Sequence, residues 1–324
     1  MIIETHKLTK KFGSLTAVDG IDLEVKEGEI FGLLGPNGAG KTTTISMLAT
    51  MQSPTSGKAK VAGFDVVSQQ DAVRNSIGVV FQDQTLDTEL TGWENLDIHS
   101  RLYSVPNKAA RIEEVLRLVT LWDKRNEFVK NYSGGMKRRL EIARGLIHEP
   151  KMLFLDEPTI GLDPQTRRGI WDYIQKMNRR DKVTVLLTTH YMDEADYLCD
   201  RVAIIDNGRI IALDTPGRLK SRLGHNTLEF TVSDPKAFCR LASGAKCKRA
   251  KSVIGNHVQI TADDGSKLIP RLLSLAEKAG IRVESVSMRS STLEDVFIQL
   301  TGRTIREEQA SSKDKWAFGR RMRL

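Results

Sequence analysis

Short, almost entirely apolar runs alternate with segments of helical periodicity along much of this chain. Hydrophobic residues dominate segments 30–34, 152–155 and 183–187, which is typical of strands that are buried on both faces of a parallel sheet. The segment 167–180, between two of these runs, has the spacing of a helix. Strands separated by helical crossovers predict an α/β fold with a mainly parallel sheet.

Two further patterns subdivide the first part of the chain. Residues 1–28 alternate apolar and polar side chains and contain turn residues, which favours a β-rich N-terminal subdomain. Residues 85–131 have helical periodicity instead, as in Ile112 and Val115. We therefore expect a helical subdomain over about 85–145, inserted between strands of the parallel sheet.

The pattern changes near Gly224. The elements that follow are a strand, a helix, two strands joined by a turn at Gly255, a helix, a strand and a last helix. This order predicts a small α+β domain of the ferredoxin-like, split βαβ type. The sequence thus divides into a first domain over 1–222 and an accessory domain over 223–303.

The last predicted helix has a clear start. Ser291 and Glu294 fit a capping box, and the apolar stripe that follows comprises Leu293, Val296, Phe297 and Leu300. Residues 304–324 are polar and basic, so we expect them to form a disordered tail.

Composition narrows the class of protein. The chain has 324 residues and a net charge of +8, and none of its apolar runs approaches the roughly 18 residues of a membrane-spanning helix. Its first residues lack the apolar segment of a secretion signal. The three cysteines, Cys199, Cys239 and Cys247, have no metal-type spacing. These features predict a cytoplasmic protein with reduced thiols.

A glycine-rich segment, GPNGAGKTT, follows the apolar run 30–34 and opens a predicted helix. Glycines let consecutive backbone N–H groups turn toward a phosphate chain, and the helix N-terminus favours an anion. Lys41 can reach the terminal phosphates, and the Thr42 hydroxyl can bind Mg²⁺. We predict that a nucleoside triphosphate binds to Gly35, Pro36, Asn37, Gly38, Ala39, Gly40, Lys41, Thr42 and Thr43.

Two other segments add chemistry to this loop. The strand MLFLD ends in Asp156, a carboxylate suited to Mg²⁺, and Glu157 can polarise a water for attack on the γ-phosphate. In YSGGM, Ser133, Gly134 and Gly135 open a second helix and offer a second anion site. One chain rarely needs two phosphate sites for one nucleotide, whereas two copies facing each other would use both.

Six segments, in this order, resemble the motifs of ABC ATPase cassettes over about residues 2–220. They are 35–43, Gln82 in VVFQD, 133–136, MLFLDEP, GLDP at 161–164 and TTH ending at His190. The resemblance implies a P-loop ATPase fold and a head-to-tail dimer. Each MgATP would lie between Lys41, Thr42 and Asp156 of one subunit and Ser133, Gly134 and Gly135 of the other.

The resemblance also implies roles for single residues. Phe12 would lie against the adenine ring, and Gln82 would touch Mg²⁺ or its water and relay the nucleotide state to a partner. Asp163 would lie across the dimer seam. His190 would contact the γ-phosphate and position Glu157, the catalytic base.

The second anion motif departs from the family pattern at two positions. Tyr132 and Met136 stand where such cassettes usually have leucine and glutamine. The contacts of Ser133 and the glycines to phosphate do not depend on these side chains. A contact from the glutamine side chain is in doubt.

Two segments indicate the kind of ABC protein. LTGWENL at 90–96 and TLEDVFIQLTGR at 292–303 resemble ATP-binding subunits of ABC-2-type exporters, with the daunorubicin-resistance type nearest. This implies a separate ABC-2-type membrane permease that docks against the helical subdomain near Gln82. The chain would then be a homodimer or heterodimer, held peripherally on the cytoplasmic face of the membrane through the permease.

An alternative is a soluble ABC ATPase that acts on nucleic acid or ribosomes, which the positive charge mildly favours. Against it, the chain carries one cassette, and the stretch between Lys41 and Asp156 is too short for a long coiled coil. An importer ATPase usually has a β-barrel accessory domain, unlike the α+β domain predicted here. The sequence does not exclude a cassette that signals without transport. We therefore expect ATP and Mg²⁺ as ligands and no nucleic acid partner.

Overall fold

The computed structural model describes residues 1–222, 226–244, 249–252, 255–262 and 264–301. It consists of two compact units, of which the first contains Met1–Leu213 and the second begins at Asp214. The division precedes the predicted boundary at 222 and 223, because helix α8 (Pro216–Ser221) packs against helix α11 (Leu293–Thr301) of the second unit.

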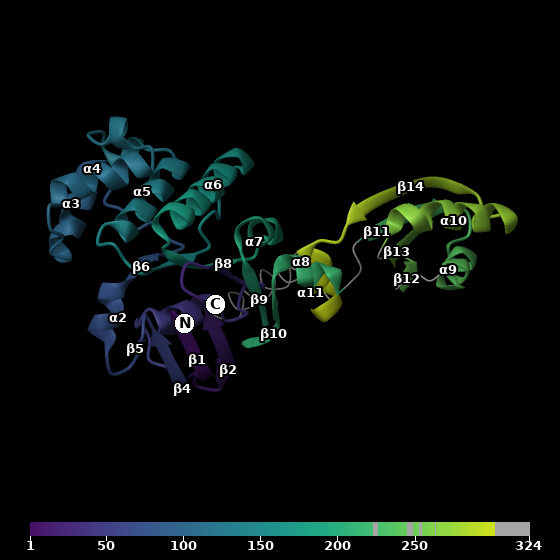
Figure 1. The fold of residues 1–324 in the computed structure, drawn as a ribbon, viewed down its shortest axis with the longest axis horizontal. Helices are drawn as coiled ribbons and strands as arrows, with labels where there is room; N and C mark the ends of the chain where they lie inside the picture. Colours follow the sequence, from purple (N-terminus) through teal and green to yellow (C-terminus); the bar gives the residue numbers. More distant parts are fainter. Residues whose placement is uncertain (223–225, 245–248, 253–254, 263, 302–324) are drawn as a thin grey trace, which may run out of the picture. The chain divides into compact units, whose positions relative to one another are not determined.

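A six-stranded sheet forms the centre of the first unit (Figure 1). Its strands in spatial order are β10 (Arg209–Asp214), β9 (Arg201–Asp206), β3 (Ile30–Leu34), β8 (Thr184–Thr189), β7 (Met152–Asp156) and β6 (Ile77–Val80). The pairings of β3 with β8 and β9, and of β7 with β6 and β8, are parallel. Every residue of β3, β7 and β8 is buried, as the apolar runs predict. The predicted α/β fold is confirmed.

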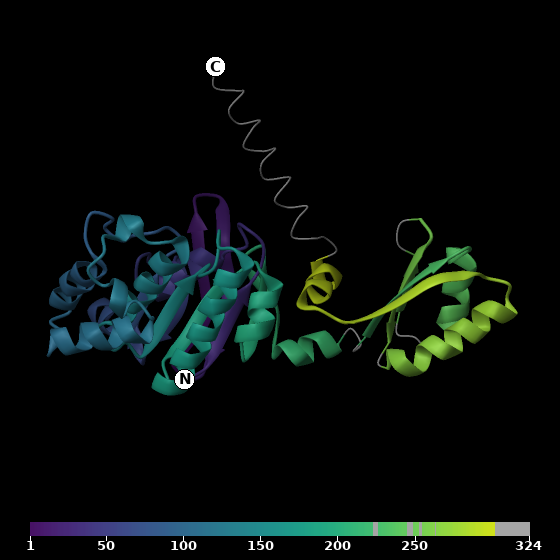
Figure 2. The same cartoon turned by 90° about the horizontal axis from the view of Figure 1, so that it is seen from above.

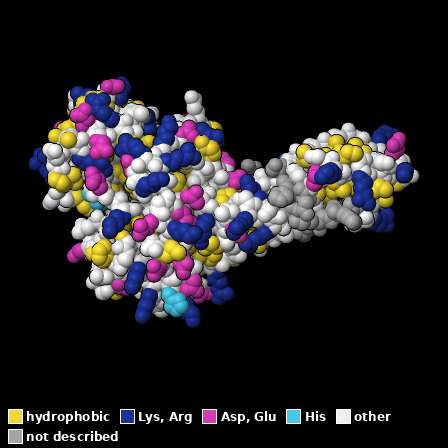
Figure 3. All heavy atoms as spheres, in the orientation of Figure 1, with side chains coloured by type: hydrophobic (Ala, Val, Ile, Leu, Met, Phe, Trp, Pro, Cys, Tyr) yellow, Lys and Arg dark blue, Asp and Glu magenta, His cyan; other side chains and the backbone are white. Residues whose placement is uncertain are grey.

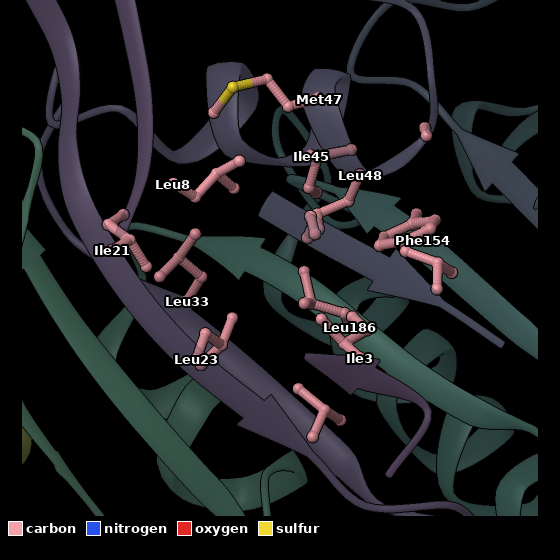
Figure 4. Packing of buried hydrophobic residues seen from close by; sticks show 14 of the residues in the cluster. Ile3, Leu8, Ile21, Leu23, Leu33, Ile45, Met47, Leu48, Phe154 and Leu186 are labelled. Atoms are coloured by element: carbon pink, nitrogen blue, oxygen red, sulfur yellow. The ribbon is translucent and has the colours of Figure 1, made fainter. Parts of the chain in front are cut away.

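The first unit also contains a four-stranded antiparallel sheet. Its strand order is β2 (Leu15–Val25), β1 (Ile3–Phe12), β4 (Ser56–Val61) and β5 (Phe64–Asp65). Side chains from both sheets and from helix α1 (Lys41–Leu48) meet in one core, which includes Leu8, Ile21, Leu33, Ile45 and Phe154 (Figure 4). This core fixes α1, and with it the glycine-rich loop, against the sheet.

Helices complete the first unit. They are α2 (Gln70–Ser76), α3 (Gly92–Leu102), α4 (Lys108–Leu118), α5 (Gly134–Leu146), α6 (Pro164–Asp181) and α7 (Met192–Leu198), with short 3₁₀ turns at Trp122–Lys124 and Val129–Asn131. Helices α3, α4 and α5 pack on one another and form a group at one side of the unit (Figure 1). Helix α3 begins with a capping box between Thr91 and Glu94.

The second unit contains β11 (Asn226–Val232), α9 (Pro235–Gly244), β12 (Arg249–Ser252), β13 (His257–Ala262), α10 (Gly265–Lys278) and β14 (Val283–Ser290), followed by α11. All pairings in the sheet, ordered β12-β13-β11-β14, are antiparallel. Helices α9 and α10 cover one face (Figure 2), where Leu228, Phe230 and Val232 are completely buried. The predicted ferredoxin-like order is therefore present.

The start of α11 differs from the prediction by one residue. The capping box consists of Thr292 and Asp295, whose side chains accept each other's backbone N–H bonds at 3.2 and 2.9 Å. Ser291 is instead buried beside Thr227. Asp295 also pairs with Arg289 at 2.8 Å, so an ion pair to the preceding strand fixes which residue caps the helix.

The surface is mixed in character. In Figure 3, basic and acidic side chains are interspersed over the visible face of the first unit, while hydrophobic side chains gather on the second. The exposed apolar residues of the second unit include Leu273, Val286 and Met288. None of the described helices combines the length and apolar character needed to cross a membrane. The predicted tail, 304–324, lies outside the described residues.

Candidate functional site

The glycine-rich loop leaves strand β3 and ends at the first turn of α1. Gly38 and Gly40 have φ angles of +82° and +104°, in the region where only glycine is free of strain. A Cβ atom at Gly40 would also lie 2.5 Å from the carbonyl oxygen of Ala17. No side chain caps α1, and its first turn has no acidic residue. Its first N–H groups are therefore available to an anion, as phosphate binding requires.

Lys41 lies at the centre of this loop and is only 5% exposed. Its Nζ donates to the carbonyl oxygens of Gly35 and Pro36 at 2.7 and 3.1 Å and forms an ion pair with Glu157 Oε1 at 3.2 Å. Burial lowers the pKa of Lys41, although the neighbouring carboxylates of Glu157 and Asp156 oppose this effect. The loop carbonyls thus hold the ammonium group over the loop, where a phosphate oxygen can compete for it.

Thr42 and Asp156 meet across the sheet edge. The Thr42 hydroxyl donates to Asp156 Oδ1 at 3.2 Å, and the Thr188 hydroxyl donates to the same oxygen at 2.5 Å. Two neighbouring ligands of an octahedral Mg²⁺ lie about 2.9 Å apart. The hydroxyl and carboxylate oxygens of Thr42 and Asp156 therefore have the chemistry and the spacing that fit this ion.

Glu157 follows β7 and turns its side chain toward both Lys41 and His190. His190 Nδ1 lies 2.5 Å from Glu157 Oε2, and both side chains are at least nine-tenths buried. Burial acts to raise the pKa of Glu157, but the hydrogen bond to His190 and the charge of Lys41 outweigh it and lower the pKa. Glu157 is thus an ionised carboxylate at neutral pH.

The backbone at Glu157 is strained. Its φ is +48°, in the left-handed region, which costs a residue with a side chain about 1–2 kcal/mol. Two bonds hold it there, because its N–H donates to the hydroxyl and the carbonyl oxygen of Thr188 at 3.1 and 3.2 Å. The sharp turn aims the side chain across the site instead of along the strand.

The second anion motif lies apart from the glycine-rich loop. Ser133 caps α5, and its hydroxyl accepts the N–H of Met136 at 3.3 Å. Ser133 and Gly134 are exposed, and among the described residues no hydrogen bond joins the motif to 35–43. Its neighbours include Leu162, 3.4 Å from the Cβ position of Gly134. Asp163 follows Leu162 and caps α6, accepting the N–H of Thr166 at 2.9 Å.

Phe12 and Gln82 are the remaining predicted site residues. Phe12 ends β1 and is 47% exposed, with Lys10 Nζ 5.2 Å from its ring centroid. Gln82 follows β6, which pairs with β7 at Val80 and Leu155, so it lies at the same sheet edge as Asp156. Gln82 is exposed, and within the described chain no hydrogen bond connects it to either carboxylate.

Sequence reasoning overlooked Thr188 and Arg138. The parallel register pairs Asp156 with Thr188, so a hydroxyl near the end of the neighbouring apolar strand is the available signal. Arg138 is 6% exposed and lies on the inner side of α5. Its signal is weaker, because an arginine next to Lys137 and Arg139 resembles part of a solvated basic surface.

Two family models match this chain. Residues 18–160 match the family model described as ABC transporter. Residues 215–301 match the one described as ATP-binding protein DrrA1-3-like, C-terminal domain.

Three relatives are similar over nearly the whole chain. The daunorubicin/doxorubicin resistance ATP-binding protein of Streptomyces peucetius is 42% identical over 97% of this chain and 98% of its own. The linearmycin resistance ATP-binding protein of Bacillus subtilis is 37% identical over 94% and 100%. The Nod factor export ATP-binding protein I of Ralstonia nicotianae is 39% identical over 94% and 95%.

Solved structures resemble the first part of the chain. A dimeric ATP-binding cassette in a post-hydrolysis state, bound to ADP and Pi, superimposes with a TM-score of 0.59 and 28% identity, covering 66% of this chain and 98% of that one. A Clostridium perfringens subunit of the cbiONQ ABC transporter complex gives 0.64 and 28%, over 67% and 90%.

Proposed function

The chain belongs to the ABC transporter ATP-binding proteins, in the group of the daunorubicin/doxorubicin resistance proteins, and we propose that it drives an exporter as its ATP-hydrolysing subunit. The main observation in support of ATP hydrolysis is the placement of Lys41, Glu157 and His190 beside an uncapped, glycine-rich helix N-terminus. The relatives named for resistance and export support the direction of transport.

The proposed hydrolysis follows from the contacts of these side chains. The loop N–H groups and Lys41 bind the β- and γ-phosphates of ATP. Glu157 accepts a proton from the attacking water. The water oxygen bonds to the γ-phosphorus as the bond between this phosphorus and ADP breaks. His190, bonded to Glu157 Oε2, orients the carboxylate. Thr42 and Asp156, assisted by Gln82, would hold Mg²⁺, which neutralises charge on the phosphates.

A dimer explains the second anion motif. Ser133, Gly134 and Gly135 are separate from the loop in their own chain, so we propose that they bind the γ-phosphate of ATP held by a second copy or a related cassette. Asp163, next to this motif, would lie at the seam, and Phe12 would stack on adenine. ATP then joins two subunits, and its hydrolysis separates them.

An ATPase that drives an exporter needs a membrane partner. We propose that an ABC-2-type permease binds the helical subdomain near Gln82 and keeps the chain on the cytoplasmic face of the membrane. The exposed position of Gln82, two residues after the end of β6, supports a role between the catalytic edge and such a partner. We propose no contact with nucleic acid, since the motifs do not require one.

Purification of the tagged chain from gently solubilised membranes tests this partner. The proposal predicts a polytopic membrane protein without a nucleotide motif, recovered in stoichiometric amount and retained after nuclease treatment. Ribosomes or DNA-bound proteins in its place, with no membrane protein, would favour a soluble ATPase and overturn the exporter.

A further inference from the structure

Arg138 and Glu141 form an ion pair inside the first unit, one turn apart on helix α5. The guanidinium Nη1 donates to Glu141 Oε2 at 2.9 Å, and the two side chains are 7% and 1% exposed. Helix α5 is the helix that begins at Ser133. The pair therefore lies one to two turns behind the second anion motif, on the same rigid element.

The guanidinium group of Arg138 donates to three backbone carbonyls outside its own helix. The acceptors are Phe81 O at 2.6 Å, Asp156 O at 3.0 Å and Pro158 O at 2.7 Å. Phe81 immediately precedes Gln82, and the other two carbonyls flank Glu157. The Arg138 side chain thus bonds to the backbone on both sides of Glu157, the proposed base. It also bonds to the start of the segment 81–85, here called the Gln82 segment.

The other end of the Gln82 segment is held by the same helix. Glu141 Oε1 accepts the N–H of Thr85 at 2.9 Å, and Arg144 donates to the carbonyl oxygen of Thr85 at 2.8 Å. The side chain of Gln82, between these two anchor points, is exposed. The segment is therefore fixed to α5 at its ends while its central side chain faces solvent.

A need for stability does not account for such a pair. Removing two charges from water costs several kcal/mol per ion, and apolar side chains of similar volume often stabilise a fold equally well. Unlike a pair of apolar side chains, Arg138 and Glu141 make hydrogen bonds with a defined direction to backbone groups. Arg138 fixes the backbone of two loops relative to one helix, at bond lengths of 2.6 to 3.0 Å.

We propose that Arg138, with Glu141 as its counter-ion, is a positioning residue for hydrolysis. It ties the helix of the second anion motif to the Gln82 segment and to the turn that carries Glu157. A displacement of α5, caused by a nucleotide bound in the opposite subunit or by a partner at Gln82, then moves the base. The inference rests on the proposed roles of Glu157 and Gln82, and it extends them to a residue that touches neither substrate nor Mg²⁺.

Three variants test this inference in the full-length protein. Arg138→Met removes the donors but leaves Glu141 buried without its partner, so kinetics are measured on a second variant that also lacks this charge. Arg138→Met combined with Glu141→Met removes both charges, so no buried ion is left without its counter-ion. Arg139→Met is the matched control, because Arg139 is next on the helix but donates to Val119 O at 3.0 Å and to Thr120, away from the catalytic turn.

We expect the double variant to remain folded and to bind ATP with wild-type affinity, while kcat for ATP hydrolysis falls roughly 10- to 100-fold and KM changes little, as for a misplaced catalytic group. The control should stay within about twofold of wild type. A double variant with wild-type kcat would show that Arg138 only neutralises Glu141, and this would overturn the inference. Failure of the proposed function looks different, since the wild-type protein would then not hydrolyse MgATP.

Discussion

At the scale of single residues, the environment of Glu157 determines what its carboxylate can do. The hydrogen bond to His190 and the ion pair with Lys41 keep it ionised, and the left-handed turn points it into the site. Glutamine has the same shape and the same backbone cost but accepts no proton. The fold and the phosphate contacts should therefore survive this replacement.

The Glu157→Gln variant should lower ATP turnover by roughly 10²- to 10⁴-fold, the usual contribution of a positioned base. Its affinity for ATP should be unchanged, and MgATP should hold it as a dimer. Phosphate release measures the first effect, and sedimentation velocity with and without MgATP measures the second. Wild-type turnover in the variant would contradict the assignment of Glu157 as the base.

Glu194 is a further buried acid near this site. It is completely buried, and its Oε1 accepts bonds from Thr159 at 2.7 Å and from Trp171 at 2.8 Å, while Oε2 has no hydrogen-bond partner among the described residues. Burial raises the pKa of Glu194 above its ordinary value of 4.5. The folded state thus favours the protonated acid, and the stability due to this group is present below pH 4.5 and is lost as the pH rises through the folded pKa.

The Glu194→Gln variant should therefore unfold at a higher temperature than wild type at pH 8, because its amide does not ionise. The difference should narrow as the pH is lowered from 8 toward 5. Thermal unfolding of both proteins, without nucleotide, across this pH range measures it. A constant difference at every pH would mean that Glu194 does not titrate in the folded protein.

Motif spacing predicts the residues that we propose to bind the nucleotide, but not the residues that hold them in place. Lys41 and Asp156 belong to local segments in which a few neighbouring residues define the chemistry. Thr188 reaches Asp156 only because β7 and β8 pair in one register. Arg138 faces inward only because of how α5 is rotated on the sheet. Such contacts depend on tertiary packing, which a pattern along the chain does not specify.

At the scale of elements, glycines provide a matched pair for testing the packing. Gly169 lies in the interior of α6 with nothing within 4 Å of its Cβ position, whereas a Cβ atom at Gly78 in β6 would lie 2.1 Å from Gly145 O on α5. Gly169→Ala should stabilise the protein by about 0.5–1 kcal/mol by favouring the helix. Gly78→Ala should destabilise it by about 1–3 kcal/mol, since β6 and α5 must separate.

Denaturant unfolding of both glycine variants, without nucleotide, checks these values. The two effects have opposite signs, so a general tolerance or intolerance of alanine cannot imitate them. Equal stability of Gly78→Ala and wild type would mean that β6 and α5 do not pack as closely as described.

Elements with strong local signals are those that the sequence predicts well. The buried strands are short apolar runs, and the order of the second unit follows from clear turns and alternation, so both agree with the structure. The start of α11 shows the limit of such signals. Ser291 and Thr292 are both good caps, and the pairing of Arg289 with Asp295 decides between them.

At the scale of the whole molecule, we propose that one chain carries two halves of an ATP site that it does not bring together. The loop with Lys41 and Glu157 forms one half, and the helix that begins at Ser133 forms the other. In a head-to-tail dimer each subunit supplies the half that the other needs. This arrangement is the central claim, because it explains how ATP binding and release become a movement of subunits.

Mixing two inactive variants tests this claim most directly. Lys41→Ala removes the phosphate contact, and Ser133→Asp keeps the helix cap while placing a negative charge against the γ-phosphate. Each variant alone should be inactive, but a heterodimer has one site with both halves intact. Random pairing of equal amounts should restore about a quarter of wild-type ATPase activity. Activity no greater than the average of the two variants would contradict a site shared between subunits.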